Sequence, residues 1–125
     1  MAIGRPVPVR VLLIDDDPTF RALARAVLDS SGLEVVGEAD TAGAGSAEAM
    51  RLRPDAILVD VGLPDRDGVA LSGDLAALPW APRIVLTSGD PDATSDAAAK
   101  RQGACGFVRK HDLFGAGVEL LVDGN

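Results

Sequence analysis

The chain has 125 residues, of which 47% are hydrophobic and 25% charged, and its formal net charge is −7. This composition is typical of one folded domain and argues against disorder over most of the chain. The acidic balance excludes electrostatic binding of nucleic acid by this segment alone, and no apolar run is long enough for a signal peptide or a membrane span. Cys105 has no second cysteine to pair with, which suits a reducing cytoplasmic location.

Strand and helix patterns alternate along the whole chain. Residues 1–8 carry two prolines and a glycine and are interpreted as a flexible leader, followed by one domain over residues 9–125. Pro18 after three aspartates marks a helix start, and Gly32 marks its end. In chain order the patterns predict a strand at 9–14, a helix from 18 to about 32, a strand at 33–39, a helix at 45–53, a strand at 56–61, a helix at 69–78, a strand at 83–87, a helix at 92–102, a strand at 106–109 and a helix at 113–122.

The strands are apolar throughout rather than alternating, which indicates a parallel sheet covered by helices on both faces. The fold class is therefore α/β, a three-layer doubly wound sheet of five strands. Ligands of such sheets bind outside the carboxyl ends of the strands.

Polar side chains stand at the predicted carboxyl ends of four strands. Asp15 and Asp16 follow the first, Asp60 ends the third, Thr87 ends the fourth and Lys110 follows the fifth. Clustered carboxylates favour a bound cation, and an oxygen-only ligand set suits Mg²⁺. A carboxylate can also attack phosphorus to form an aspartyl phosphate, with the cation and an ammonium group neutralising the transferred oxygens.

At this point the sequence resembles the receiver domain of two-component response regulators. The resemblance covers residues 9–122 and rests on VLLIDDDP, PDAILVDVGLPDRDG, IVLTSG and GACGFVRK, in that order. It implies a flavodoxin-like fold with strand order 2-1-3-4-5. Because Lys110 is followed by His111 rather than by proline, the chain leans toward the LuxR/NarL-type subgroup.

The resemblance also implies roles for individual residues. Asp60 is expected to be the phosphoacceptor, and Asp15, Asp16, Asp60 and the backbone carbonyl of Gly62 to form the Mg²⁺ site. Lys110 is expected to contact the phosphoryl group, Thr87 to be the switch hydroxyl, and Phe107 to be either a switch aromatic or ordinary core.

The same resemblance implies the partners of the domain and the structural change that follows phosphorylation. A histidine kinase or phosphotransfer protein would donate the phosphoryl group. The surface of the fourth helix, fifth strand and fifth helix would then change, with homodimerisation through that surface as a hypothesis. DNA would be bound only through a downstream domain, and the domain would have no enzymatic activity beyond its own phosphorylation and slow dephosphorylation.

Several alternatives remain open on the sequence. Asp17 is expected to cap a helix, and the whole aspartate triplet could do no more than that. Asp15 in DDDPT also fits the nucleophile motif of haloacid-dehalogenase-type phosphatases, although that family gives Asp60 no role. A third reading is a degenerate receiver that binds partners without phosphorylation. Gly62 and Gly89, where larger side chains are common in the family, predict an unobstructed pocket.

Overall fold

A computed structural model describes residues 7–124 and contains one five-stranded sheet. All neighbouring strands are parallel, and their order is β2-β1-β3-β4-β5, which confirms the predicted α/β fold. The strands are β1 (Arg10–Ile14), β2 (Glu34–Ala39), β3 (Ala56–Asp60), β4 (Arg83–Ser88) and β5 (Gly106–Arg109).

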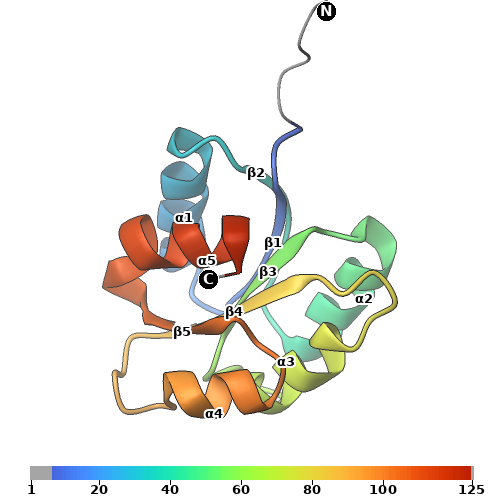
Figure 1. Cartoon of the computed structure of the whole chain (residues 1–125), viewed down its shortest axis with the longest axis vertical. Helices are drawn as coiled ribbons and strands as arrows, with labels where there is room; N and C mark the ends of the chain where they lie inside the picture. The colour runs from blue at the N-terminus through green and yellow to red at the C-terminus, as the bar shows by residue number, and fades with distance from the viewer. Residues whose placement is uncertain (1–6, 125) are drawn as a thin grey trace, which may run out of the picture.

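Five α-helices connect and cover the strands, so the fold has three layers (Figure 1). In the view of Figure 1, α1 and α5 lie on one side of the sheet and α2 and α3 on the other, while α4 lies beside β5. The helices are α1 (Pro18–Ser30), α2 (Ala42–Leu52), α3 (Gly68–Ala76), α4 (Asp96–Arg101) and α5 (Val118–Asp123).

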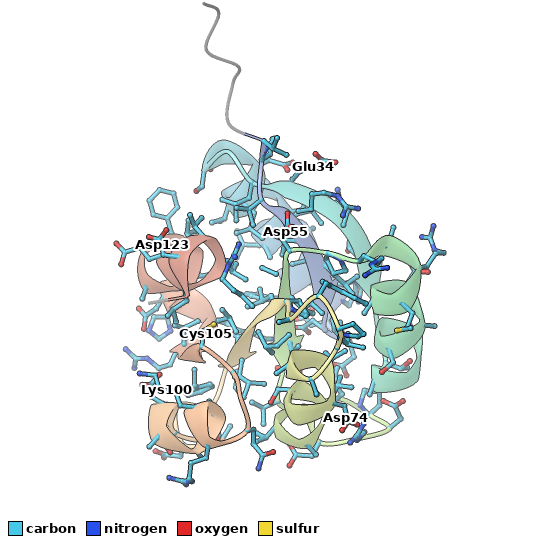
Figure 2. The ribbon with its side chains drawn as sticks, turned by 45° about the vertical axis from the view of Figure 1, so that its right-hand side comes forward. Glu34, Asp55, Asp74, Lys100, Cys105 and Asp123 are labelled. Atoms are coloured by element: carbon cyan, nitrogen blue, oxygen red, sulfur yellow. The ribbon has the colours of Figure 1, made fainter. Side chains whose placement is uncertain are left out.

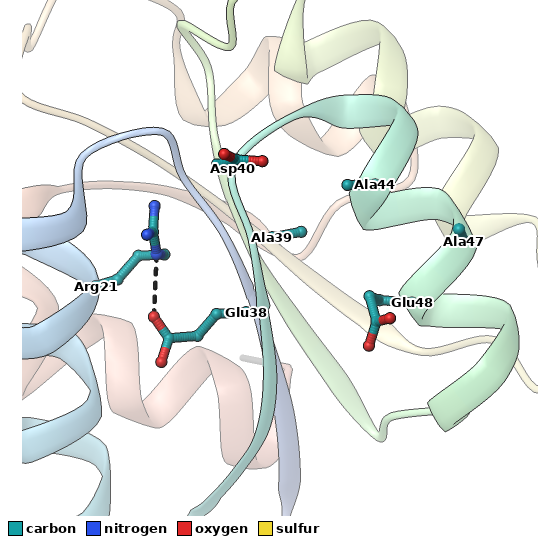
Figure 3. A pocket seen from close by; sticks show the side chains of 7 residues that line it. All are labelled: Arg21, Glu38, Ala39, Asp40, Ala44, Ala47 and Glu48. Carbon is teal, nitrogen blue, oxygen red and sulfur yellow. Dashed lines mark hydrogen bonds and ion pairs between the residues drawn. The ribbon is translucent and has the colours of Figure 1, made fainter.

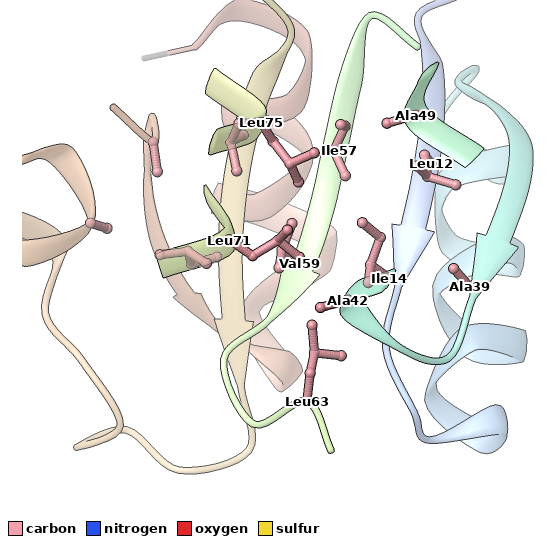
Figure 4. Close-up of a cluster of buried hydrophobic side chains, with 14 residues drawn as sticks. Leu12, Ile14, Ala39, Ala42, Ala49, Ile57, Val59, Leu63, Leu71 and Leu75 are labelled. Carbon is pink, nitrogen blue, oxygen red and sulfur yellow. The ribbon is translucent and has the colours of Figure 1, made fainter. Parts of the chain in front are cut away.

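Each face of the sheet has its own hydrophobic core. Because successive residues of a strand point to opposite faces, Leu12 and Ile14 enter one core and Val11 and Leu13 enter the other. Figure 4 shows the first core, where the side chains of β1 and β3 meet those of α2 and α3. The central strand β3 is buried along its whole length, which explains why its sequence is continuously apolar up to Asp60.

Side-chain caps mark the beginnings of the first four helices, and two of these caps correct the predicted bounds. Thr41 accepts a hydrogen bond from the backbone N–H of Ala44, so α2 begins at Ala42 rather than at residue 45. Ser95 likewise caps α4, which begins at Asp96 rather than at residue 92. In both cases the position of the Ser or Thr cap, rather than the alanine-rich or glycine-rich composition around it, determines where the helix begins.

The predicted helix over 113–122 is not a single α-helix. A 3₁₀ turn, Lys110–Asp112, leads into a π-helical segment, Leu113–Gly117, and α5 follows. Gly115 and Gly117 lie in the π-helical segment, and glycine is a poor α-helix former. The wider turn still directs Leu113 and Leu121 into the core on the α1 side of the sheet.

The amino ends of the strands form the edge opposite to the carboxyl ends. Figure 2 labels Glu34 and Asp55 there, close to where the chain enters β1. Trp80 packs at the same edge, where its indole N–H donates to the carbonyl oxygen of Pro54 at 3.0 Å and Arg53 lies over its ring. Six of the eight residues of the predicted leader lie outside the described residues. Across 7–124, no helix has the length and apolar character needed to span a membrane.

Candidate functional site

The sheet brings the predicted site residues together at its carboxyl edge. Asp15 directly follows β1, Asp60 is the last residue of β3, and Lys110 directly follows β5. Thr87 lies on β4 in register with Asp60, so the two residues are neighbours across adjacent strands. The connection from β1 to α1 adds Asp16, while Asp17 caps α1 by accepting a hydrogen bond from the N–H of Thr19.

Three carboxylates form a compact acidic cluster. One oxygen each from Asp15, Asp16 and Asp60 lie within 4.8 Å of one another. Asp15 and Asp60 are buried, whereas Asp16 is exposed at the mouth of the site. Burial, followed by the charge of Asp15, raises the pKa of Asp60 to about 6, against the opposing effects of Lys110 and of the Gly62 N–H.

The cluster has the properties expected of a cation site. Its donors are all oxygen atoms, which hard divalent cations prefer. Oδ2 of Asp15 is buried and has no partner with hydrogen-bond geometry among the described residues, so a lone pair is available there. A cation would also relieve the mutual repulsion that helps to keep Asp60 protonated.

Within residues 7–124, Lys110 is the only basic side chain that forms an ion pair with the carboxylates of this cluster. Its Nζ lies 2.9 Å from Oδ2 of Asp15 and 3.8 Å from Oδ1 of Asp60. The shorter contact is an ion pair without the angle of a directed hydrogen bond, because Asp15 Oδ2 remains unpaired by that criterion. The ammonium group is therefore held near Asp60 mainly by electrostatic attraction.

Thr87 is fully buried, and its hydroxyl has no hydrogen-bond partner within the part of the chain that the structure describes. Leaving such a group unpaired is unfavourable, so an unsatisfied hydroxyl beside a carboxylate indicates a place where a ligand oxygen can bind. Ser88, the alternative hydroxyl, instead accepts a hydrogen bond from the N–H of Asp90 and caps a turn.

The mouth of the site is open, as the two glycines predict. A Cβ atom added at Gly89 would meet no atom within 4 Å, and one at Gly62 would approach only Oδ2 of Asp60, at 3.8 Å. Phe107 is the second residue of β5 and lies away from the carboxyl edge, where it is partly buried against the core and its N–H donates to Asp96. That position is compatible with both core packing and the switch role.

The family model of the response regulator receiver domain matches residues 11–114. This chain belongs to the receiver domain family. The match includes every residue of the carboxyl-edge cluster.

Two relatives of this receiver domain are named as transcription regulators. It is 35% identical to the probable transcriptional regulatory protein NarL of Mycobacterium tuberculosis over 125 residues, covering 98% of this chain and 57% of NarL. It is 33% identical to the "virulence factors putative positive transcription regulator BvgA" of Bordetella pertussis over 103 residues, covering 82% of this chain and 49% of BvgA. The chain thus spans about half the length of these curated relatives.

Solved receiver structures have the same fold. The receiver domain of NarL from Mycobacterium tuberculosis superposes with a TM-score of 0.79 at 30% identity, covering 94% of this chain and 99% of that one. The response regulator domain of CheB from Thermotoga maritima gives a TM-score of 0.81 at 23% identity, covering 94% and 96%, and supports the fold alone. The similarity to NarL agrees with the LuxR/NarL-type leaning of the sequence.

The receiver domain also contains supporting contacts that sequence reasoning missed. Nη1 of Arg21 donates to the carbonyl oxygen of Asp15, and Nε of Arg21 pairs with Glu38 at 3.0 Å. This ion pair forms one wall of a cleft of about 490 Å³ between α1 and α2 beside β2 (Figure 3). The sequence signal that could have indicated these contacts is an arginine one turn beyond the aspartate triplet.

A second missed contact fixes the segment that follows Asp60. The carboxylate of Asp65 accepts hydrogen bonds from the N–H groups of Ala42, at 2.8 Å, and Gly43, at 3.0 Å. These bonds lower the pKa of Asp65 and attach the β3–α3 connection to the first turn of α2. No local pattern reveals this contact, because its partners lie more than twenty residues apart.

Proposed function

We propose that this receiver domain accepts a phosphoryl group on Asp60 and uses the modification as a signal. The observation that carries the proposal is the arrangement at the end of the central strand. Asp60 lies in a three-carboxylate cluster, has Nζ of Lys110 3.8 Å away, and is in register with a buried hydroxyl that has no partner among residues 7–124.

Mg²⁺ fits the oxygen donors of this site, and when bound it neutralises charge on the transferred phosphoryl oxygens. Asp16 and Asp60 would hold it directly together with the backbone carbonyl of Gly62, while Asp15 would act mainly through a water molecule. Asp60 provides the attacking carboxylate oxygen, and Lys110 stabilises negative charge on one phosphoryl oxygen. The hydroxyl of Thr87 donates a hydrogen bond to another.

The donor is a histidine kinase or a phosphotransfer protein. A phosphorus–nitrogen bond of the donor histidine breaks as a phosphorus–oxygen bond forms at Asp60, and the electron pair of the broken bond returns to the imidazole. Water later cleaves the acyl phosphate and restores the carboxylate. The domain turns over no other substrate, so it acts as a switch rather than as an enzyme.

Phosphorylation of Asp60 would affect the surface of the domain through the residues beside it. Thr87 moves toward the phosphoryl group and Phe107 follows it, which changes the surface formed by α4, β5 and α5. That surface acts on an output domain or on a second receiver domain in a homodimer, in the cytoplasm, and DNA is reached only through a separate domain. Light scattering with and without beryllofluoride tests the homodimer, since a monomer under both conditions contradicts it.

Acetyl phosphate and Mg²⁺ provide the direct test of phosphorylation. The parent protein should gain the mass of one phosphoryl group, and Asp60→Asn should gain none. Asp40→Asn is the matched control, because Asp40 is an exposed carboxylate at the carboxyl end of β2 and lies outside the acidic cluster. Beryllofluoride should also change the amide NMR spectrum of the parent. No mass gain and no spectral change would favour the degenerate receiver.

Hydrolysis of a phosphate ester by Asp60→Asn and Asp15→Asn distinguishes the phosphatase alternative from the proposed function. A phosphatase that uses Asp15 would hydrolyse a generic phosphate ester, would retain that activity in Asp60→Asn and would lose it in Asp15→Asn. We expect no such hydrolysis by the parent protein.

A further inference from the structure

Phe20 places an aromatic ring against the positive charge of the site. Nζ of Lys110 lies over the ring of Phe20, 4.5 Å from its centroid. This distance is within the range of cation–π attraction. Phe20 is 7% exposed, so the contact is largely shielded from water.

Phe20 belongs to the same short segment as the acidic residues. It lies in the first turn of α1, which Asp17 caps through the N–H of Thr19 at 3.0 Å. One residue further on, the guanidinium group of Arg21 holds the carbonyl oxygen of Asp15. The ring and the carboxylate that pairs with Lys110 are therefore fixed relative to each other.

The other end of the contact is fixed as well. Lys110 begins the 3₁₀ turn after β5, and Leu113 of the next turn is buried in the same hydrophobic core as Phe20. The backbone of Lys110 is thus anchored to the core that contains the ring. Ordering the long side chain of Lys110 at the site costs conformational entropy, and a contact with a nearby group offsets that cost.

We propose that Phe20 is a positioning residue for Lys110: the face of its ring holds the ammonium group within reach of both Asp15 and Asp60. This inference rests on the proposed phosphorylation of Asp60. The ring acts only through Lys110 and contacts neither the phosphoryl donor nor the metal.

An aromatic ring meets a requirement that other residues do not. The ammonium group pairs with Asp15 at 2.9 Å without hydrogen-bond geometry, and its distance of 3.8 Å to Asp60 is too long for a hydrogen bond. Neither carboxylate therefore holds it by a directed bond that would keep it from a phosphoryl oxygen. The ring attracts the cation through its quadrupole but offers no lone pair that competes with an incoming phosphoryl oxygen. A leucine would exclude water equally but would provide no such attraction.

Phe20→Leu tests the proposal, with Phe20→Tyr as the variant that retains the ring. Phosphorylation by acetyl phosphate is followed at saturating Mg²⁺ over a range of donor concentrations. We expect Phe20→Leu to lower the maximal rate by about 3- to 30-fold, the range that a cation–π contact of this kind corresponds to. The Mg²⁺ affinity should remain within about twofold, and Phe20→Tyr should restore the rate to within about twofold of the parent.

A double-mutant cycle separates this role from a general loss of packing. In a Lys110→Met background, Phe20→Leu should have no further effect on the rate, because the ring acts through the ammonium group. An equal effect in both backgrounds overturns the proposal. Leu28→Val is the matched packing control, since Leu28 is buried in the same core two turns along α1, and it should leave the rate unchanged.

An NMR measurement tests the contact without any phosphorylation. Protons on the ε-carbon of Lys110, assigned by their loss in Lys110→Arg, should be shifted upfield by the ring in the parent and return toward ordinary lysine values in Phe20→Leu. Ordinary values in the parent overturn the proposal even if the variants do not fold. An upfield shift in a protein that cannot be phosphorylated would leave the contact supported and contradict the proposed function instead.

Discussion

Replacing Asp60 by asparagine should stabilise the metal-free protein at neutral pH. In the folded protein Asp60 retains its proton up to about pH 6, whereas its ordinary value is 3.8. The folded state therefore binds more protons than the unfolded state between these two values. The contribution of Asp60 to the free energy of unfolding is fully present below pH 3.8 and is lost as the pH rises through about 6. Asparagine has the same shape and cannot ionise, so it avoids this loss.

The size of the effect follows from the two pKa values. A difference between 3.8 and about 6 corresponds to at most roughly 3 kcal/mol. The open mouth of the site at Gly62 and Gly89 lets solvent screen the charge of Asp60, so the expected stabilisation is smaller, about 1–2 kcal/mol at pH 7.5. At pH 4 the variant and the parent should differ little.

Urea unfolding with a chelator present measures this difference at pH 4 and at pH 7.5. Only the difference between variant and parent is interpreted, because Glu38, Asp65 and Asp96 have lowered pKa values and give stability a pH dependence of the opposite sign. Asp40→Asn serves as the control. The explanation fails if Asp60→Asn is no more stable than the parent at pH 7.5, or if its advantage is the same at both pH values.

Added Mg²⁺ should reverse the order of stability. A cation at a hundred times its dissociation constant for the folded parent adds about 2.7 kcal/mol to the free energy of unfolding, which exceeds the advantage of Asp60→Asn. Asp60→Asn lacks one of the three carboxylates and should gain less. The midpoint of urea unfolding at pH 7.5, measured over a series of Mg²⁺ concentrations, gives both values.

Three further predictions concern residues around the site. Thr87→Val should raise the stability of the metal-free protein by about 1 kcal/mol in urea unfolding, because it removes a buried hydroxyl that has no partner within the described residues; a loss of stability would show that the hydroxyl is hydrogen-bonded. Asp65→Ala should lower the urea midpoint at pH 7, because the N–H groups of Ala42 and Gly43 lose their acceptor. Its deficit should shrink as the pH falls below 3.8, where the unfolded chain takes up a proton first because the pKa of Asp65 is lowered in the folded protein. The fluorescence of Trp80 should stay constant when beryllofluoride binds, since its bond to Pro54 lies at the opposite edge of the sheet; a change in emission would reveal a longer-range rearrangement.

The strands and the residues at their ends could be predicted from the sequence because both depend on local patterns. The short apolar run that ends at Asp60 indicates a strand buried on two faces, and the carboxyl ends of parallel strands lie at one edge of the sheet. Asp15, Asp60, Thr87 and Lys110 therefore meet once the strand order is known.

The contacts that support the site depend on distant partners and could not be predicted in this way. Asp65 is an ordinary turn residue in the sequence, yet it caps a helix that begins twenty-three residues earlier. The helical spacing of Phe20 predicts a buried residue, and the structure confirms this. No local pattern indicates that the ammonium group of Lys110, which follows ninety residues later in the chain, lies over its ring. The π-helical segment is not predicted because Leu113 and Leu121, eight residues apart, fit the spacing of one continuous α-helix.

The carboxylate of Asp60 and the hydroxyl of Thr87 are neighbours at the carboxyl edge, and each is in an energetically unfavourable environment. Asp60 is buried beside another carboxylate, so its charged form is disfavoured, and the adjacent hydroxyl of Thr87 has no partner within residues 7–124. A cation alone would correct the first of these and leave the second. A phosphoryl group on Asp60 with a cation beside it would correct both, because its oxygens can accept from Thr87 and from Lys110 while the cation neutralises the carboxylates. The site is therefore more complementary to the phosphorylated carboxylate than to the free one, which favours a switch whose modified state is stabilised by the same residues that direct the reaction.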